Sequence, residues 1–131
     1  SELKIAKDGM IRIIEIGARM GGDFIGSDLV HMSTGVDFVR AVIQIALGEE
    51  PDLVPDRETK IAGVRFIFSK EDADIFYKLQ KEHPEYIVDY EISDDLTGAV
   101  TDSSTRLGYF MMQADSRDEL LKYMPEQGSV D

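Results

Sequence analysis

The sequence has no cysteine, and its 14 lysine and arginine residues are outnumbered by 26 aspartate and glutamate residues. The lack of cysteine excludes a disulfide framework and a thiolate metal site. A net charge of −12 argues against a nucleic-acid partner, because contacts to phosphates need patches of lysine and arginine. No apolar run approaches the roughly 18 residues of a membrane span, and no signal peptide is recognisable. We therefore expect a cytoplasmic protein that binds neither nucleic acid nor a membrane.

Several catalytic signatures are also missing. The sequence contains no Walker A loop, no H-E-x-x-H motif, no zinc-ligand spacing and no nucleophile triad. The glycine-rich stretch 21–26 does not have the G-x-G-x-x-G arrangement of a dinucleotide-binding loop. The residues that suggest chemistry are concentrated at the start of the chain.

Two alternating runs, residues 3–6 and 11–16, flank the dipeptide Asp8-Gly9. Asp-Gly between such runs is a strong signal for a two-residue hairpin turn, which needs positive φ at both central positions. With Asp8-Gly9 as the loop, the numbers of opposed residues sum to 17, so that Lys4 would face Ile13. The sequence therefore predicts an antiparallel hairpin in that register.

In this register Glu2 faces Glu15 across the hairpin. Like charges directly opposed on a sheet are unfavourable, so a nearby cation is expected to offset them. If the chain stays extended, the same face continues through Gly17 to Arg19. Mg²⁺ is usually held by one or two carboxylates together with substrate phosphates, and arginine provides a planar fork for phosphate or carboxylate oxygens. The alternative is that the glutamates are solvated strand residues and that Arg19 simply pairs with one of them.

Glu2 followed by the run Glu15-Ile-Gly-Ala-Arg-Met-Gly-Gly-Asp23 resembles the end of an ATP-grasp domain. In that superfamily, two acidic residues on neighbouring strands bind the magnesium ions of ATP, and the second of them begins an E-x-N-x-R motif. The spacing and the Arg-x-Gly-Gly extension are most similar to the branch that includes L-amino-acid ligases. Enzymes like biotin carboxylase and carbamoyl-phosphate synthase resemble it less.

The resemblance implies a role for each matching residue. Glu2 and Glu15 would be the metal ligands for the Mg²⁺ of ATP, with Mn²⁺ as an alternative ion. Arg19 would hold an acyl phosphate or the substrate carboxylate, and Gly22 would lie near the same reacting group. Gly17 stands where many members have asparagine, so whether both metal sites are intact remains open.

The resemblance extends along the chain and divides it into parts. Residues 1–50 would be the C-terminal end of an ATP-grasp domain, residues 51–60 a linker rich in proline and charge, and residues 61–131 a small C-terminal subdomain. In the first part, Ser33 or Thr34 is expected to cap a helix that Gly48 ends. Its apolar stripe predicts core packing; the stripe consists of Val36, Val39, Ile43, Ala46 and Leu47.

The second part is predicted to alternate strands and helices, with strands over 61–68, 86–92 and 106–114. Ser69-Lys-Glu-Asp72 resembles a capping box that starts a helix ending at His83-Pro84, and Ser116 would cap a last helix through Met124. The fold class expected is thus α+β, with antiparallel strands and helices of an ATP-grasp remnant followed by a small α/β sandwich. A polar cluster forms either a lip over the substrate or a capped loop; its members are Asp102, Ser103, Ser104 and Arg106.

The resemblance implies a fragment of an ATP-dependent ligase that joins a small carboxylate to an amine, forming an amide such as a peptide bond through an acyl phosphate. Two alternatives remain open: a non-catalytic acidic binding domain, and an ATP-grasp carboxylase or an enzyme like carbamoyl-phosphate synthase. The chain begins inside a predicted strand, so we expect it to be a C-terminal fragment that is inactive alone. The identities of the carboxylate and the amine are open, as is a homodimer.

Overall fold

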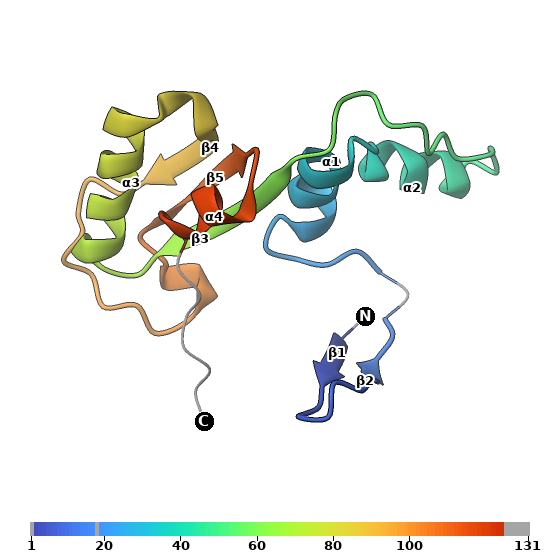
Figure 1. Ribbon diagram of the computed structural model, residues 1–131, viewed down its shortest axis with the longest axis horizontal. Helices are drawn as coiled ribbons and strands as arrows, with labels where there is room; N and C mark the ends of the chain where they lie inside the picture. The colour runs from blue at the N-terminus through green and yellow to red at the C-terminus, as the bar shows by residue number, and fades with distance from the viewer. Residues whose placement is uncertain (1, 18, 125–131) are drawn as a thin grey trace.

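The computed structural model of the chain describes residues 2–17 and 19–124. It begins with a two-stranded hairpin, continues with three helical segments, and ends with a three-stranded sheet and its helices (Figure 1). The first half contains β1 (Glu2–Ile5), β2 (Ile11–Glu15), the π-helix η1 (Ile25–Leu29), α1 (Val30–Thr34) and α2 (Phe38–Ala46). The second half contains β3 (Ile61–Ile67), α3 (Lys70–Glu82), the short 3₁₀ segments η2 (Pro84–Tyr86) and η3 (Ser103–Thr105), β4 (Ile87–Ile92), β5 (Gly108–Ala114) and α4 (Arg117–Leu121).

The hairpin forms as predicted, but its loop differs. The Gly9 N–H donates to the Ala6 carbonyl and the Ala6 N–H to the Met10 carbonyl, both at 2.9 Å, so the loop has three residues and not two. Gly9 has φ of +81°, which fits a three-residue loop with a left-handed last position. As a result, Lys4 faces Arg12 and not Ile13, and the predicted register is wrong next to the loop.

A β-bulge then restores the predicted pairing at the open end of the hairpin. The register shifts between Glu2 and Leu3, where β2 contains one extra residue, and Glu2 lies opposite Glu15. The opposed glutamates are therefore confirmed, although they arise from two compensating irregularities and not from a regular ladder.

Helix α2 differs from the prediction in its N-cap residue and in the burial of its apolar face. Asp37 caps α2 by accepting from the Arg40 N–H at 2.9 Å, because Ser33 and Thr34 donate instead to carbonyls of the preceding turns. Gly48, with φ of +78°, follows the helix end as expected.

The predicted apolar stripe of α2 does not form a core. Ala41 is buried, but Ile43 is 54% exposed and Leu47 is 70% exposed. Helix α2 extends away from the second sheet in Figure 1, so little of the described chain lies against its apolar face. The prediction of core packing at this helix is therefore wrong for the described residues.

The second sheet has the strand order β3-β5-β4, with both pairs antiparallel. The even-numbered residues of the central strand β5 face the main core beneath α3 and α4, where Phe110, Met112 and Ala114 are at most 1% exposed. Odd-numbered residues face the first half of the chain: the Gln113 side-chain amide donates to the Met32 carbonyl at 2.7 Å. Both faces of β5 are thus covered, and this strand joins the two halves.

The caps in the second half agree with the sequence. Ser69 accepts from the Asp72 N–H, and Asp72 accepts in turn from the Phe68 N–H at 3.0 Å and from Arg65 Nε at 3.2 Å. Ser116 caps α4, which ends at Leu121 and not at Met124. The α+β class is confirmed, whereas the division at residues 50 and 60 stays a prediction and the predicted end at residue 131 lies outside the described residues. Within residues 2–17 and 19–124, no helix has the length and apolar character that crossing a membrane requires.

Candidate functional site

A small hollow of about 210 Å³ opens at the end of the hairpin. Glu2 and Glu15 line it together with Gly17 and Arg19, so the structure brings together the residues that the sequence predicts to act on metal and phosphate. The Arg19 Nη1 donates to the Met20 carbonyl at 3.1 Å. Among the described residues no salt bridge joins Arg19 to either glutamate, and this arrangement leaves both carboxylates and the guanidinium facing solvent-accessible space.

The donor set of this hollow suits a hard divalent cation that also binds substrate. Mg²⁺ usually takes one or two carboxylates and completes its octahedral shell with water and phosphate oxygens. In the described part of the chain, no group of three or more histidine, aspartate or glutamate side chains is arranged to hold a metal by itself. Two carboxylates therefore fit a shared metal–nucleotide site better than a closed structural metal site.

Gly17 leaves open space beside these groups. A Cβ atom at this position would lie 4.0 Å from Oε1 of Glu15 and 3.8 Å from Cγ of Arg19. A longer side chain at residue 17 would therefore extend along the carboxylate and the arginine, and glycine contributes no ligand of its own there.

The segment from Met20 to Gly26 forms a compact turn beyond the hollow. A Cβ on Gly26 would lie 2.9 Å from Cβ of Met20, and the Ile25 N–H donates to the Gly22 carbonyl at 3.0 Å. Asp23 and Phe24 both have positive φ, at 51° and 64°. Positive φ in two successive residues other than glycine is costly and persists only where surrounding contacts enforce it.

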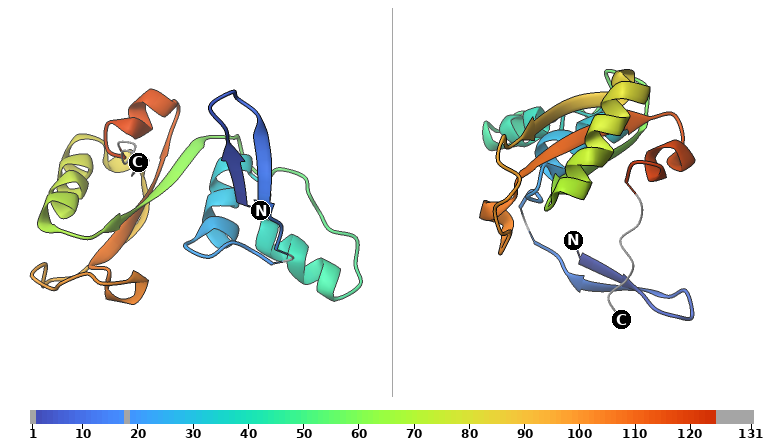
Figure 2. Two further views of the ribbon diagram at one scale, coloured as in Figure 1. Left: turned by 90° about the horizontal axis from the view of Figure 1, so that it is seen from below. Right: turned by 90° about the vertical axis from the view of Figure 1, so that its left-hand side faces the viewer.

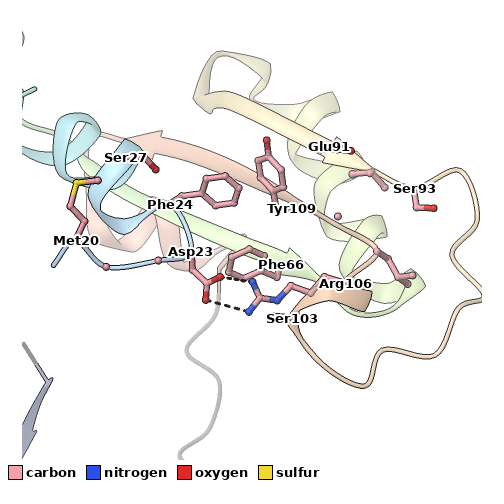
Figure 3. A pocket seen from close by; sticks show the side chains of 15 residues that line it. Met20, Asp23, Phe24, Ser27, Phe66, Glu91, Ser93, Ser103, Arg106 and Tyr109 are labelled. Carbon is pink, nitrogen blue, oxygen red and sulfur yellow. Dashed lines mark hydrogen bonds and ion pairs between the residues drawn. The ribbon is translucent and has the colours of Figure 1, made fainter. Parts of the chain in front are cut away.

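A second, larger cavity of about 720 Å³ lies on the other side of this turn (Figure 3). It is bounded by the turn itself, by β3 and β5, and by the loops before β5 and after β4. Met20 and Gly21 line both hollows, so the two spaces adjoin along the segment that follows Arg19. The side chains labelled around the larger cavity are Met20, Asp23, Phe24, Ser27, Phe66, Glu91, Ser93, Ser103, Arg106 and Tyr109.

An arginine–aspartate pair crosses this cavity. Arg106 Nη1 and Nη2 donate to the two carboxylate oxygens of Asp23 at 2.7 and 3.3 Å (Figure 3). The hydrogen bond from Arg106 lowers the pKa of Asp23 below its usual value, and the same bond raises the pKa of the guanidinium. The guanidinium also stacks over the Phe66 ring, 3.7 Å from its centroid.

Aromatic contacts hold the turn against the sheet. The Phe24 ring lies 4.4 Å from Tyr109 and 6.1 Å from Phe66, centroid to centroid, and those two residues face each other across β3 and β5. The Tyr109 hydroxyl donates to Asp89 at 2.8 Å. This bond and burial raise the pKa of Tyr109 to about 12.

Three comparisons with known proteins bear on this arrangement. No protein-family model and no curated protein sequence matches the chain. Among solved structures, the chain is similar to an L-amino acid ligase from Bacillus licheniformis, with 21% sequence identity and a TM-score of 0.65 over 92% of this chain. The chain spans 33% of the length of that ligase.

The described chain therefore shares the fold of part of this L-amino acid ligase. This likeness confirms the resemblance and the fold class predicted from the sequence. The roles of Glu2, Glu15, Arg19 and Gly22 remain predictions, because similarity at this identity establishes a shared fold alone.

The predicted polar cluster divides into two roles within this fold. Asp102 caps η3 by accepting from the Ser104 N–H at 2.8 Å and from its hydroxyl at 2.6 Å, as the capped-loop alternative predicts. Ser103 and Arg106 instead line the larger cavity. No motif in the sequence marks Phe66 or Tyr109. Both occupy the strand face opposite the main core, which alternation along β3 and β5 could have indicated.

Proposed function

We propose that this chain is part of an ATP-dependent ligase that joins a small-molecule carboxylate to an amine. The observation that carries the proposal is the placement of Glu2 and Glu15 opposite each other, with Arg19 on the same hollow. Two carboxylates and a guanidinium that has no carboxylate partner among the described residues provide the charges that a metal–nucleotide and a phosphorylated carboxylate require.

In this proposal each hollow has its own task. Glu2 and Glu15 would hold Mg²⁺ at the small hollow, where the ion would supply positive charge to offset the negative charge of the transferring phosphoryl group. Arg19 donates to the acyl phosphate or the substrate carboxylate and keeps it in place until the amine attacks. The larger cavity, which adjoins at Met20 and Gly21, has room for the organic substrate next to Gly22.

No side chain of the chain needs to form a covalent bond in this reaction. The contribution of the protein is the orientation of charged groups before the reaction, which lowers the barrier because those groups need not reorganise in the transition state. The protein of which this chain is a part would thus require ATP, Mg²⁺, a carboxylate and an amine for turnover.

The test is ADP release by the protein extended upstream to the length of the ligase it resembles. With Mg²⁺ and pooled amino acids, we expect release by the wild type and a loss of about 100-fold or more in Glu15→Gln, equivalent to roughly 3 kcal/mol of transition-state stabilisation. Glu49→Gln, which changes an exposed glutamate beyond α2, is the matched control and should retain the wild-type rate. Circular dichroism should show all three proteins folded.

The alternatives predict other outcomes of the same assay. ADP release that depends on bicarbonate would indicate a carboxylase or an enzyme like carbamoyl-phosphate synthase. A folded protein that releases no ADP with any substrate pool would indicate a binding domain, and a normal rate in Glu15→Gln would contradict the assignment of that residue.

A further inference from the structure

The pair of Arg106 and Asp23 connects residues that are 83 positions apart in the sequence. The Arg106 side chain is only 20% exposed, and its Nε has no hydrogen-bond partner among the described residues, so Asp23 supplies the acceptors of this guanidinium. A bidentate bond between arginine and a carboxylate fixes orientation as well as distance, which a lysine ammonium cannot do. The position of the Asp23 carboxylate is therefore set by the loop that leads into β5.

The residues on either side of Asp23 are also held in place. Phe24 lies against Tyr109 on the sheet, and Gly22 is tied by its carbonyl to the Ile25 N–H. A Cβ on Gly21 would lie 3.0 Å from Cβ of Ile25, so this glycine already packs closely against the first turn of η1. Gly22 and Asp23 thus have little freedom to move separately.

Arg19 lies at the beginning of the same turn. It is followed by Met20, whose side chain contacts Gly26 at the far end of the turn and whose carbonyl accepts from the Arg19 guanidinium at 3.1 Å. Residues 20–26 thus form a loop whose two ends are close together. A displacement of Asp23 within this loop would therefore also displace the backbone at Arg19. The two positive φ values at Asp23 and Phe24 are unfavourable for residues other than glycine, so these contacts offset a backbone cost in the turn.

We propose that Arg106 is a positioning residue, which holds Asp23 so that the turn of residues 19–26 presents Arg19 and Gly22 to the reacting groups. This inference rests on the proposed function, because it assigns Arg106 an effect on the same reaction. Arg106 lines the larger cavity and not the small hollow, and its guanidinium is engaged there by Asp23, so it acts through the turn and not on the nucleotide. Its removal should therefore slow turnover while the binding of ATP stays the same.

The test compares Arg106→Gln, Arg106→Lys and Asp23→Asn in the upstream-extended protein. For Arg106→Gln we expect kcat to fall about 10- to 100-fold, the range expected when reacting groups are misplaced by about 1 Å, with KM for ATP within about twofold of wild type. Arg106→Lys keeps the charge but loses the fork, and its kcat should be intermediate. Hydrogen exchange of the peptide covering residues 19–26 should be faster in each variant.

Arg65→Gln is the matched control, because it also breaks a partly buried arginine–aspartate pair. Arg65 bonds Asp72 at the start of α3 and lines neither hollow, so this variant should lose stability while it keeps kcat and normal exchange in residues 19–26. The comparison separates positioning from a general loss of stability. Should Arg106→Gln fail to fold, Arg106→Lys and Asp23→Asn provide the same comparison.

Two results would overturn the proposal. Unchanged exchange of residues 19–26 in the Arg106 and Asp23 variants would show that the pair does not hold the turn, whatever the activity. Faster exchange with a normal kcat would show that the turn does not control the reaction. If the wild-type protein releases no ADP, the proposed function fails, whereas the exchange measurement still tests whether Arg106 restrains the turn.

Discussion

Tyr109 is the residue whose protonation the fold changes most clearly on the cavity side of the sheet. Its hydroxyl donates to Asp89, and this bond together with burial raises its pKa to about 12, from an ordinary value of about 10. Because the raised pKa favours the neutral phenol in the folded state, the stabilisation is complete below about pH 10 and is lost as the pH rises towards 12.

This shift predicts late ionisation of one phenol. In a near-ultraviolet titration of the folded protein, part of the tyrosinate absorbance should develop only near pH 12, and Tyr109→Phe should reduce that late part. Burial and a hydrogen bond to Glu82 also raise the pKa of Tyr123 to about 12, so some late absorbance should remain in the variant. A late phase of unchanged amplitude in Tyr109→Phe would contradict the assignment.

The backbone of β4 lies close against Gly108 of β5. Its φ is +142°, and a Cβ atom there would collide with the backbone carbonyl oxygen of Glu91, which cannot move without distorting β4. Gly108→Ala should therefore lower the free energy of unfolding by about 3 kcal/mol or more. Gly9 is the matched control, since its φ is also positive but no atom lies within 4 Å of the added Cβ.

Chemical denaturation of the two variants separates the free-energy cost of a positive φ from the cost of the steric clash with Glu91. Gly9→Ala should cost only about 1 to 2 kcal/mol, the usual penalty for a residue other than glycine in the left-handed region. Equal decreases in the free energy of unfolding of the two variants would mean that strand β4 moves to accommodate the added Cβ. The close approach at Gly108 would then not contribute to the stability of the sheet.

The elements also show which parts of the structure the sequence could predict. Local signals succeeded where one segment determines the result, as in the capping box from Ser69 to Asp72 and in the order of strands and helices over residues 61–121. Alternation could place Glu2 opposite Glu15, but it could not distinguish a two-residue loop from a three-residue loop followed by a bulge. Both solutions place a turn at the same dipeptide.

Nonlocal features were beyond such reasoning. The periodicity of α2 correctly identified an apolar face, but no local pattern indicates what covers that face, and Ile43 remains 54% exposed. The bond from Arg106 to Asp23 joins the loop before β5 to a turn 83 residues earlier. The sequence marks Arg106 as part of a polar cluster and Asp23 as the end of a motif, but no local pattern indicates that the two residues pair. The sequence therefore predicted the end of the site near the hairpin and not the restraint on its other side.

At the scale of the whole molecule, exposed apolar side chains and negative charge have opposite effects on association between copies of the chain. The pairs Leu3–Ile13 and Ile5–Ile11 place four side chains, each at least 55% exposed, on the hairpin, which stands apart from the second sheet in Figure 2. Apolar surface gathered in this way favours association, whereas a net charge of −12 keeps copies apart.

The 131-residue chain should consequently associate with itself in a salt-dependent manner. Raising the salt concentration screens the repulsion between copies, with a Debye length of about 10 Å at 0.1 M and about 3 Å at 1 M, and leaves the apolar attraction in place. Sedimentation velocity should thus show monomers at low salt and larger species at high salt.

Combining Ile5→Lys with Ile13→Lys should suppress the larger species, because these substitutions place charge on opposite strands of the exposed face. Val54→Lys, at a 75% exposed position in the loop after α2, adds the same type of charge elsewhere and should leave most of the association intact. Equal suppression by Val54→Lys would show that the hairpin face has no special part in association, because a lysine at either place makes the net charge less negative and cannot increase the repulsion between copies.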